Sequence, residues 1–403
     1  MCGLTGEVRF DRAPDAQAVR RASDAIAHRG PDAEGFFTEG PAAFGHRRLS
    51  ILDIAGGVQP MIENGVVLIF NGQIYRHEAL REELRQKGHT FRTRSDTEVV
   101  LRAFLEWGED FASHLDGMFA LALWEPWRER LVLARDRVGK KPLYYALFNH
   151  GASAGADPVD DGATRAASQV VFASELKALF ARGDVPKDLD ETAFVQYLAA
   201  ESVPGSRSIL RGVHKLPAAH VAVFDRTGFR VRRYWELPAP SAEARAHSSH
   251  AHDSHLPSGE LYEAGQKLLS LLDGAVARRL VADVPVGVFL SGGIDSSTLS
   301  ALAARHKSPL DTFSIGFQEA SFDETPYALT VAKHIGSRHQ VETLSGQDCV
   351  DLLPAAVDSL CEPLADASFL PTLLLSRFTR KHVTVALAGD GGDELFAGYD
   401  PFL

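Results

Sequence analysis

Hydrophobic and polar positions alternate differently in the two halves of the chain. The first half has short apolar runs typical of strands, at residues 4–10, 66–70, 118–124, 130–134 and 170–173. Helical patterns lie among them, at residues 16–28, 77–87 and 97–115. Layers of sheet and of helix are therefore both expected there.

The second half alternates regularly between the two kinds of pattern. Strands are predicted at residues 286–290, 312–317, 338–343 and 383–388. Helices are predicted at residues 296–306, 324–336, 347–360 and 370–381. Strands that alternate with helices predict a parallel, doubly wound sheet with its ligand site at the carboxyl ends of the strands.

A polar segment, residues 236–259, separates the two halves and is rich in proline, serine and alanine. Its composition is typical of a linker. Four histidines within it could bind adventitious metal, but no scaffold fixes their geometry, so the linker interpretation is preferred. We therefore predict an α/β protein of two domains, residues 2–235 and 260–403.

Composition narrows the classes of function. The chain has 403 residues, of which 45% are hydrophobic and 24% charged, enough for two domains with full cores. A net charge of −11 without a basic tract argues against nucleic-acid partners. No apolar run has the length of a membrane span, and the first residues do not resemble a signal peptide. Small-molecule partners, no membrane association and a cytoplasmic location are expected.

Cysteines are few and do not form a pattern. Cys2, Cys349 and Cys361 are odd in number and lack metal-ligand spacing. Neither a disulfide framework nor a zinc site is indicated.

One glycine-rich turn indicates nucleotide chemistry. An apolar run ends in Ser291-Gly292-Gly293, and Asp295 and Ser296 then lead into a helical pattern. The glycines allow a sharp turn and close approach to a ligand, and the N–H groups at the helix start face an anion. Asp295 could hold Mg²⁺ over phosphates. The alternative is an ordinary helix capped by serines.

The complete motif, SGGIDSS, is more specific than a capped helix. The chain lacks the G-x-x-x-x-G-K-[ST] pattern of proteins that transfer a γ-phosphate. SGGIDSS instead resembles the pyrophosphate loop of the N-type ATP pyrophosphatases. The resemblance implies cleavage of ATP between the α and β phosphates and transfer of AMP to a carboxylate.

Cys2 directly follows the initiator methionine. Removal of Met1 would leave a residue that carries both a thiol and a free α-amine. An α-amine titrates near pH 7 to 8, so it can accept the thiol proton without a histidine. The alternative is a cysteine that is second in the chain by chance, and other segments must decide between the two.

Four later segments favour the catalytic interpretation. HRGPD, HRRLSILD, FNGQIY and RSDTEV follow MCG in this order and resemble the class II glutamine amidotransferase domain. The resemblance implies an N-terminal-nucleophile fold of αββα type, with Cys2 as the nucleophile. Asn71 and the Gly72 N–H would form the oxyanion hole, Arg48 would bind the substrate carboxylate and Asp96 its ammonium. The implied glutamine-binding residues are Arg48, Leu49, Ser50, Ile51, Leu52, Asn71, Gly72, Gln73 and Asp96.

Two positions depart from the pattern of that family. Gln73 stands where the family has glutamate, and Arg76 where it usually has asparagine. A charge-assisted hydrogen bond is worth about 1.5–3 kcal/mol, and a glutamine carbonyl keeps only part of it. The affinity for glutamine is therefore expected to be weak.

A second glycine loop ends the last predicted strand. Residues 388–399 read AGDGGDELFAGY and, with SGGIDSS, SFDET and CEPLADAS, resemble the synthetase domain of the glutamine-hydrolysing asparagine synthetase B family. The resemblance implies Mg²⁺ held by Asp295 and Asp393, with Asp390 near the acyl acceptor. The implied ATP-binding residues are Leu290, Ser291, Gly292, Gly293, Asp295, Ser296, Ile315, Ala388 and Gly389.

The two resemblances together imply ATP-dependent asparagine synthesis from aspartate and glutamine. The alternatives are an amidotransferase or β-lactam-forming relative that acts on another carboxylate, and a nucleotide-binding pseudoenzyme. The family's later lysine and its arginine motif are not present in residues 1–403, so we expect a fragment or a truncated product. A homodimer is left open as the assembly.

Overall fold

The computed structural model describes residues 1–153, 155, 157–239, 258–319, 323–396 and 398–399, which form two compact units. Unit 1 comprises Met1–Leu237 and Leu360–Asp366, and unit 2 comprises Pro238–Ser359 and Ala367–Leu403. Most of the segment predicted as a linker, residues 240–257, lies outside the described residues.

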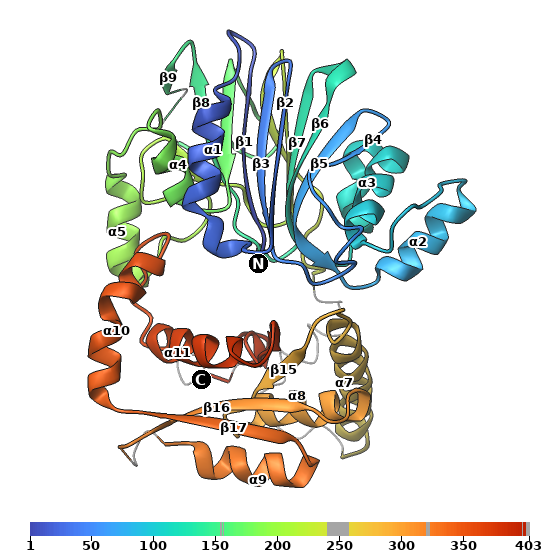
Figure 1. Ribbon diagram of the computed structural model, residues 1–403, viewed down its shortest axis with the longest axis vertical. Helices are drawn as coiled ribbons and strands as arrows, with labels where there is room; N and C mark the ends of the chain where they lie inside the picture. The colour runs from blue at the N-terminus through green and yellow to red at the C-terminus, as the bar shows by residue number, and fades with distance from the viewer. Residues whose placement is uncertain (154, 156, 240–257, 320–322, 397, 400–403) are drawn as a thin grey trace. The chain divides into compact units, whose positions relative to one another are not determined.

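Unit 1 contains two antiparallel sheets (Figure 1). The first has the order β12 (Val213–Lys215), β8 (Tyr144–Asn149), β11 (Gln169–Ala173), β1 (Gly3–Arg9), β3 (Ala42–Arg48) and β2 (Ala33–Glu39), with β9 (Ala152–Ser153) paired to β8. The second has the order β10 (Thr164–Arg165), β14 (Gly228–Arg233), β13 (His220–Asp225), β7 (Arg130–Arg135), β6 (Gly117–Glu125), β5 (Val66–Ile74) and β4 (Met61–Glu63).

Three apolar clusters fix the layers of unit 1. One lies between the two sheets and joins residues such as Leu4 and Phe44 of the first sheet to Ile69 of the second. Another packs α2 (His77–Gln86) and α3 (Asp96–Trp107) on the second sheet. The third packs α1 (Ala16–Ala25) and α4 (Leu176–Arg182) on the first sheet. The predicted αββα arrangement is confirmed.

Some boundaries differ from the prediction. The helix predicted over residues 97–115 is α3, which ends at Trp107, followed by the 3₁₀ helix η2 (Gly108–His114). Gly108 has φ +57°, a positive value that favours glycine and cannot continue an α-helix. The apolar pattern continues because Phe111 and Ala112 of η2 are also fully buried. Unit 1 also contains η1 (Ala27–Arg29), η3 (Pro126–Arg128) and α5 (Glu191–Ala200).

The segment Leu360–Asp366 is distant in sequence from the rest of unit 1 but belongs to it. The carboxylate of Glu362 accepts hydrogen bonds from the backbone N–H of Ile209 (2.9 Å), Lys215 Nζ (3.0 Å) and the Tyr144 hydroxyl (3.2 Å). The Cys361 thiol accepts one from the N–H of Leu176 (2.8 Å). Burial raises the pKa of Cys361 to about 11, so this thiol keeps its proton at neutral pH.

Unit 2 is built on a parallel sheet of order β17 (Arg338–Leu344), β16 (Asp311–Phe317), β15 (Val286–Phe289) and β18 (Val385–Leu387). Its helices are α7 (Ser258–Arg279), α8 (Ile294–His306), α9 (Thr325–Ile335), α10 (Gly346–Ser359), α11 (Phe369–Arg380) and α12 (Gly392–Phe396). Figure 1 shows α11 and α9 on opposite sides of β16 and β17, as expected for a doubly wound sheet. Within the described ranges, none of the helices is long and apolar enough to cross a membrane.

Candidate active sites

Cys2 lies where β1 begins beside the end of β3. Gly3 pairs with Arg47 in the antiparallel register, which places Cys2 next to Arg48 and Leu49. The backbone N–H of Leu49 donates to the Cys2 sulfur (3.4 Å), and the thiol approaches the Leu49 carbonyl oxygen (3.6 Å). Burial raises the pKa of the thiol, and the Leu49 hydrogen bond, the terminal amine and Arg48 act against that increase. The thiol therefore needs a base before it can act as a nucleophile.

Arg48 is a buried cation beside the thiol. Its guanidinium donates to the carbonyl oxygens of Ile54 (2.7 Å), Asp53 (2.8 Å) and Leu52 (3.3 Å). These bonds hold the loop that follows β3, which contains Leu49, Ser50, Ile51 and Leu52. A guanidinium has five N–H groups, more than these three carbonyls require. Its role as a carboxylate clamp stays a prediction.

Asn71 and Gly72 lie near the end of β5. Asn71 is 1% exposed, and among the described residues its amide nitrogen and oxygen have no hydrogen-bond partner. Strand alternation puts Asn71 on the same face as Ile69, which packs against the first sheet, from which Cys2 emerges. A β-carbon at Gly72 would collide with the Met118 carbonyl oxygen. A buried amide without partners is costly, and the role of this amide in an oxyanion hole stays a prediction.

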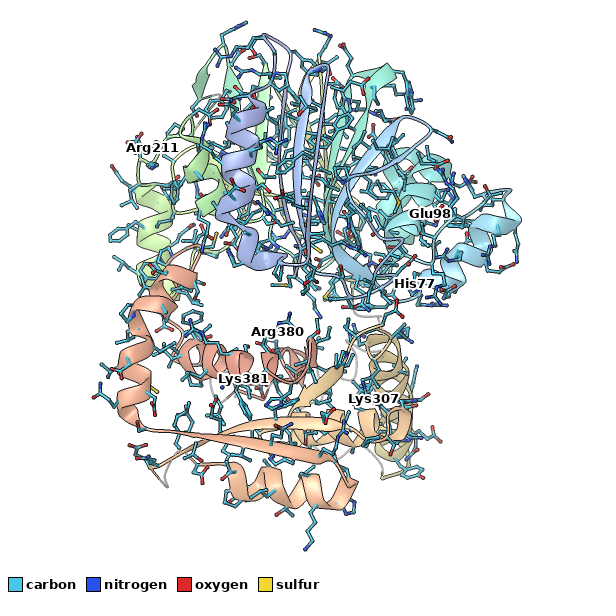
Figure 2. All side chains as sticks on the ribbon, in the orientation of Figure 1. His77, Glu98, Arg211, Lys307, Arg380 and Lys381 are labelled. Atoms are coloured by element: carbon cyan, nitrogen blue, oxygen red, sulfur yellow. The ribbon has the colours of Figure 1, made fainter. Side chains whose placement is uncertain are left out.

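Asp96 is the first residue of α3, directly after the helix cap Ser95. Its carboxylate accepts a hydrogen bond from the N–H of Ile74 (2.9 Å) at the end of β5. Burial raises the pKa of Asp96, while this hydrogen bond and the charge of His77 act in the opposite direction. Figure 2 marks His77 at the start of α2; its ring Nδ1 lies 3.0 Å from the Ile74 carbonyl oxygen. Gln73, which precedes Ile74, is also buried.

The structure therefore brings most of the predicted glutaminase residues together. Arg48 and Asp96 both act electrostatically on the Cys2 thiol, and Leu49 contacts it directly. The N–H of Ser50 donates to Asp32 Oδ2 (2.8 Å), which belongs to the motif HRGPD.

Sequence reasoning did not assign roles to Arg29, Glu175 and Lys141. Arg29 Nε donates to the Cys2 carbonyl oxygen (2.9 Å), and its Nη1 donates to the Glu175 carboxylate (2.7 Å). Lys141 Nζ lies 2.9 Å from the sulfur of Met1. All three side chains are buried. The sequence feature that could have indicated two of them is a charged residue in a mostly apolar motif: Lys141 in KPLYY and Glu175 in FASELK.

The loop after β15 has the form of an anion cradle. The Ser296 hydroxyl accepts hydrogen bonds from the backbone N–H groups of Ser291 and Gly292, each 3.2 Å long. Gly292 has φ +94°, and a β-carbon there would lie 2.5 Å from the backbone nitrogen of Ala328. Only glycine fits this conformation and this approach to α9. The N–H groups of the loop thus converge on one hydroxyl, in the way that they would surround a phosphate oxygen.

A second loop meets the first at Asp295. β15 and β18 are parallel neighbours, so the loops after them lie at the same edge of the sheet. A β-carbon at Gly392 would collide with the Asp295 carboxylate, and one at Gly389 would lie 3.3 Å from the Asp295 β-carbon. The predicted residues of the two motifs are therefore neighbours in space.

The other predicted ATP-binding residues lie at or near the same edge of the parallel sheet. The N–H of Leu290 donates to the Phe313 carbonyl oxygen of β16 (2.9 Å), and Ile315 is half-buried two residues further along β16. Ala388 and Gly389 follow β18, Asp390 is exposed, and Asp393 is half-buried in α12. Among the described residues, no group of three or more His, Cys, Asp and Glu side chains is arranged to hold a metal ion. A site at Asp295 and Asp393 stays a prediction.

Comparison with known proteins identifies both units. Residues 1–235 match the model of the glutamine amidotransferase domain, and residues 267–403 match that of asparagine synthase. Asparagine synthetase [glutamine-hydrolyzing] 3 of Bacillus subtilis is 35% identical over 427 residues, which cover 100% of this chain and 64% of that protein. Putative asparagine synthetase [glutamine-hydrolyzing] 2 of Methanocaldococcus jannaschii is 33% identical, covering 99% of this chain and 76% of that protein.

The chain is shorter than several of these relatives, spanning 64% of the first and 59% of asparagine synthetase [glutamine-hydrolyzing] 1 of Bacillus subtilis. A solved glutamine phosphoribosylpyrophosphate amidotransferase from B. subtilis aligns with a TM-score of 0.42 and 14% identity, covering 85% of this chain and 81% of that one. The two domain matches and the similarity to the M. jannaschii protein show that the chain belongs to the glutamine-hydrolysing asparagine synthetase family.

Proposed function

We propose that the protein makes asparagine from aspartate and ATP, with ammonia released from glutamine at Cys2. The observation that carries the proposal is the arrangement around the thiol. Leu49 and Arg48 adjoin Cys2, and the unpartnered amide of Asn71 faces the sheet that bears it. The family relationship and the glycine loops of unit 2 support the second reaction.

The first reaction begins after removal of Met1. The Cys2 thiol gives its proton to its own α-amine, and the thiolate attacks the side-chain carbonyl carbon of glutamine. Asn71 Nδ2 and the Gly72 N–H stabilise the oxyanion. The α-amine returns the proton to the leaving nitrogen, so that the C–N bond breaks and ammonia leaves. Water then hydrolyses the thioester to glutamate and regenerates the thiol.

The charged neighbours suit the two charged groups on the α-carbon of glutamine. Arg48 provides a guanidinium for the α-carboxylate. Asp96 provides a buried carboxylate for the α-ammonium, and Gln73 adds only a neutral amide where a second carboxylate would strengthen the contact.

The second reaction joins aspartate to AMP. The N–H groups of Ser291, Gly292 and Gly293 surround the pyrophosphate portion of ATP, and the aspartate side-chain carboxylate attacks the α-phosphorus. Pyrophosphate leaves, and ammonia then displaces AMP from β-aspartyl-AMP. Asp390 lies on the loop proposed to face the acyl acceptor.

Asp295 and Asp393 fit a bound Mg²⁺. Carboxylate oxygens are the ligands that Mg²⁺ prefers, and the packing of Asp295 against Gly392 brings the two loops together. Mg²⁺ would neutralise charge on the departing pyrophosphate. A cytoplasmic location and a homodimer are parts of the proposal that fractionation and light scattering would test.

The test has two independent readouts. Mass spectrometry of the purified protein should show Met1 removed and a glutamine-analogue electrophile bound at Cys2. Retention of Met1 in an active glutaminase would contradict the assignment. Cys2→Ala should abolish glutamine hydrolysis but leave any ammonia-dependent synthesis intact, since the two sites are chemically separate.

The acceptor is identified by a different assay. Pyrophosphate exchange into ATP, with Mg²⁺ present, should be stimulated by aspartate and not by glutamate or by carboxylic acids without an amine. Stimulation by another acid would favour a different amidotransferase. Tight ATP binding without exchange or glutamine hydrolysis would indicate a pseudoenzyme.

A further inference from the structure

Lys141 is a buried lysine near the amino terminus that the proposed chemistry does not use. It lies between β7 and β8 and is 6% exposed. Its backbone N–H donates to Asp136 Oδ2 (3.0 Å), and its carbonyl accepts from Arg135 Nε (2.8 Å). Asp136 is itself fully buried and also accepts from the N–H of Phe119 (3.1 Å). The base of the lysine is therefore fixed in the fold.

The ammonium of Lys141 lies beside Met1, the residue whose removal the proposed reaction requires. Its Nζ lies 2.9 Å from the sulfur of Met1. A thioether is a weak acceptor, so this contact does little to stabilise a buried charge. Lys141 also interacts electrostatically with Cys2, whose α-amine becomes the terminal amine when Met1 is removed. Arg29 holds the same residue through its hydrogen bond to the Cys2 carbonyl (2.9 Å).

We propose that Lys141 is a positioning residue whose charge keeps the α-amine of Cys2 in its neutral, proton-accepting form. The inference rests on the proposed glutaminase reaction, in which that amine is the base. An α-amine has a pKa of about 7.7–8.0, so most of it is protonated and inactive at pH 7. A nearby like charge disfavours the protonated amine and makes the base available at lower pH.

The charges around Cys2 favour this effect. The cations are Arg29, Arg48 and Lys141. The acidic groups near them are Asp96, Glu175 and Asp136.

Asp96 accepts from the Ile74 N–H, and Glu175 is paired with Arg29 at 2.7 Å and with His28. Asp136 accepts from the N–H groups of the loop that carries Lys140 and Lys141. Glu175 thus offsets the charge of Arg29, and Asp96 acts on Cys2 against Arg48. Among the described residues the ammonium of Lys141 forms no ion pair, so its charge still acts on the terminal amine.

Lys141 is charged where its charge matters. Burial, followed by the charge of Arg29, lowers the pKa of Lys141 to about 8, with Asp136 and Cys2 acting in the opposite direction. Below pH 8 the side chain is therefore mainly an ammonium, and this is the range in which the terminal amine gains its proton. Lys141 is therefore charged at the pH values at which its charge would disfavour protonation of the terminal amine.

The test compares Lys141→Met, Lys141→Arg and Lys140→Met in the full chain. Lys140 is the adjacent lysine and is exposed, so it is a matched control. The measurement is kcat/KM for glutamine hydrolysis between pH 5.5 and 9.5. We expect the acid limb in Lys141→Met to move up by about one pH unit, with activity near that of the parent protein above pH 9. Lys141→Arg and Lys140→Met should keep the original limb.

A uniform loss of activity at every pH, without movement of the limb, would show a structural role and overturn the proposal. A second measurement does not require glutamine turnover. The rate of Cys2 alkylation by iodoacetamide, followed by mass spectrometry of the amino-terminal peptide, should shift to higher pH in Lys141→Met. An unshifted profile would also overturn the proposal. A shifted profile in a chain that does not hydrolyse glutamine would support Lys141 and contradict the proposed function.

Discussion

Arg29 donates a hydrogen bond of 2.9 Å from its Nε to the carbonyl oxygen of Cys2. The same guanidinium donates to Glu175, the residue before α4. One buried ion pair therefore links the backbone of Cys2 to the helix α4, which packs on the first sheet. Buried pairs of this kind stabilise little in total, but the loss of one partner leaves the other charge unpaired. The position of Cys2 therefore depends on a residue distant in sequence.

Glu175→Gln should lower stability and change its dependence on pH. Burial would raise the pKa of Glu175, but hydrogen bonds and charge from Arg29 and His28 outweigh burial and lower it. A carboxyl whose pKa is lower in the folded state contributes stability above its unfolded pKa of about 4.3. That contribution is lost as the pH falls from there through the folded pKa.

Urea unfolding followed by circular dichroism checks this prediction. The difference in stability between the parent protein and Glu175→Gln should be about 1–3 kcal/mol at pH 7 and should shrink below pH 4. Glu191→Gln, an exposed change at the start of α5, serves as the control and should have little effect at either pH. A difference that stays constant with pH would show that the ion pair is not responsible.

Asp96→Asn should weaken glutamine binding and remove the rise in KM for glutamine at low pH. Asparagine can still accept the hydrogen bond from Ile74, so the strand and helix should keep their arrangement. Burial raises the pKa of Asp96, so the carboxylate gains a proton at a higher pH than an ordinary aspartate. As the pH falls through that raised pKa, the KM for glutamine should rise in the parent protein.

The measurement is KM for glutamine between pH 5 and 8 in both proteins. In Asp96→Asn, KM should be raised about tenfold or more at pH 7, since a charge-assisted contact is lost, and should vary little with pH. An increase in KM at low pH that persists in Asp96→Asn would assign the titration to another group.

Gln73→Glu should lower KM for glutamine with kcat little changed. Gln73 is buried next to the strand end that binds Asp96, so a carboxylate there would meet the substrate ammonium. The gain of charge is worth about 1 kcal/mol or more, a decrease in KM of about fivefold to tenfold. Interactions made equally in the ground and transition states change KM and leave kcat alone.

Initial-rate kinetics at pH 7.5 decide this case, with Gln73→Met as the neutral control that should raise KM. An unchanged KM in Gln73→Glu would show that Asp96 alone suffices for the ammonium.

The periodicity of the sequence predicted several strands that apolar residues bury, as in β5, β6 and β7, but it missed β8 and β13, which are also largely apolar and buried. It missed β3 because that strand reads AAFGHRR, and charged residues interrupt the apolar run. His46 and Arg48 are nevertheless buried, since hydrogen bonds compensate them: His46 Nε2 lies 3.1 Å from the Phe70 carbonyl oxygen. Burial lowers the pKa of His46 to about 4, so its ring stays neutral.

The site was predictable where motif residues are close in sequence and not where they meet through space. Cys2, Asn71 and Asp96 belong to motifs whose order was recognisable. Lys141 reaches Met1 across 140 positions, and its place in the motif KPLYY does not indicate what its ammonium contacts. The contact is visible only in the folded structure, because it depends on how the strands that carry these residues pair.

Gly292→Ala should destabilise unit 2 and abolish nucleotide binding. Gly292 has φ +94°, and an added β-carbon would lie 2.5 Å from the Ala328 nitrogen and 2.6 Å from the Tyr327 β-carbon. The conformation alone costs about 1–3 kcal/mol for a residue with a side chain. The helix α9 would have to move, and the N–H groups that converge on Ser296 would no longer be aligned.

Gly293→Ala is the matched control in the same loop. Gly293 has φ −67° and ψ 167°, which any residue adopts, and its added β-carbon would lie 3.5 Å from the Ser291 hydroxyl oxygen, an ordinary contact. Thermal unfolding and equilibrium binding of ATP with Mg²⁺ should therefore change far less in Gly293→Ala than in Gly292→Ala. Equal losses in the two variants would mean that bulk anywhere in the loop is excluded by the ligand. In that case the backbone conformation of Gly292 would not be what shapes the cradle.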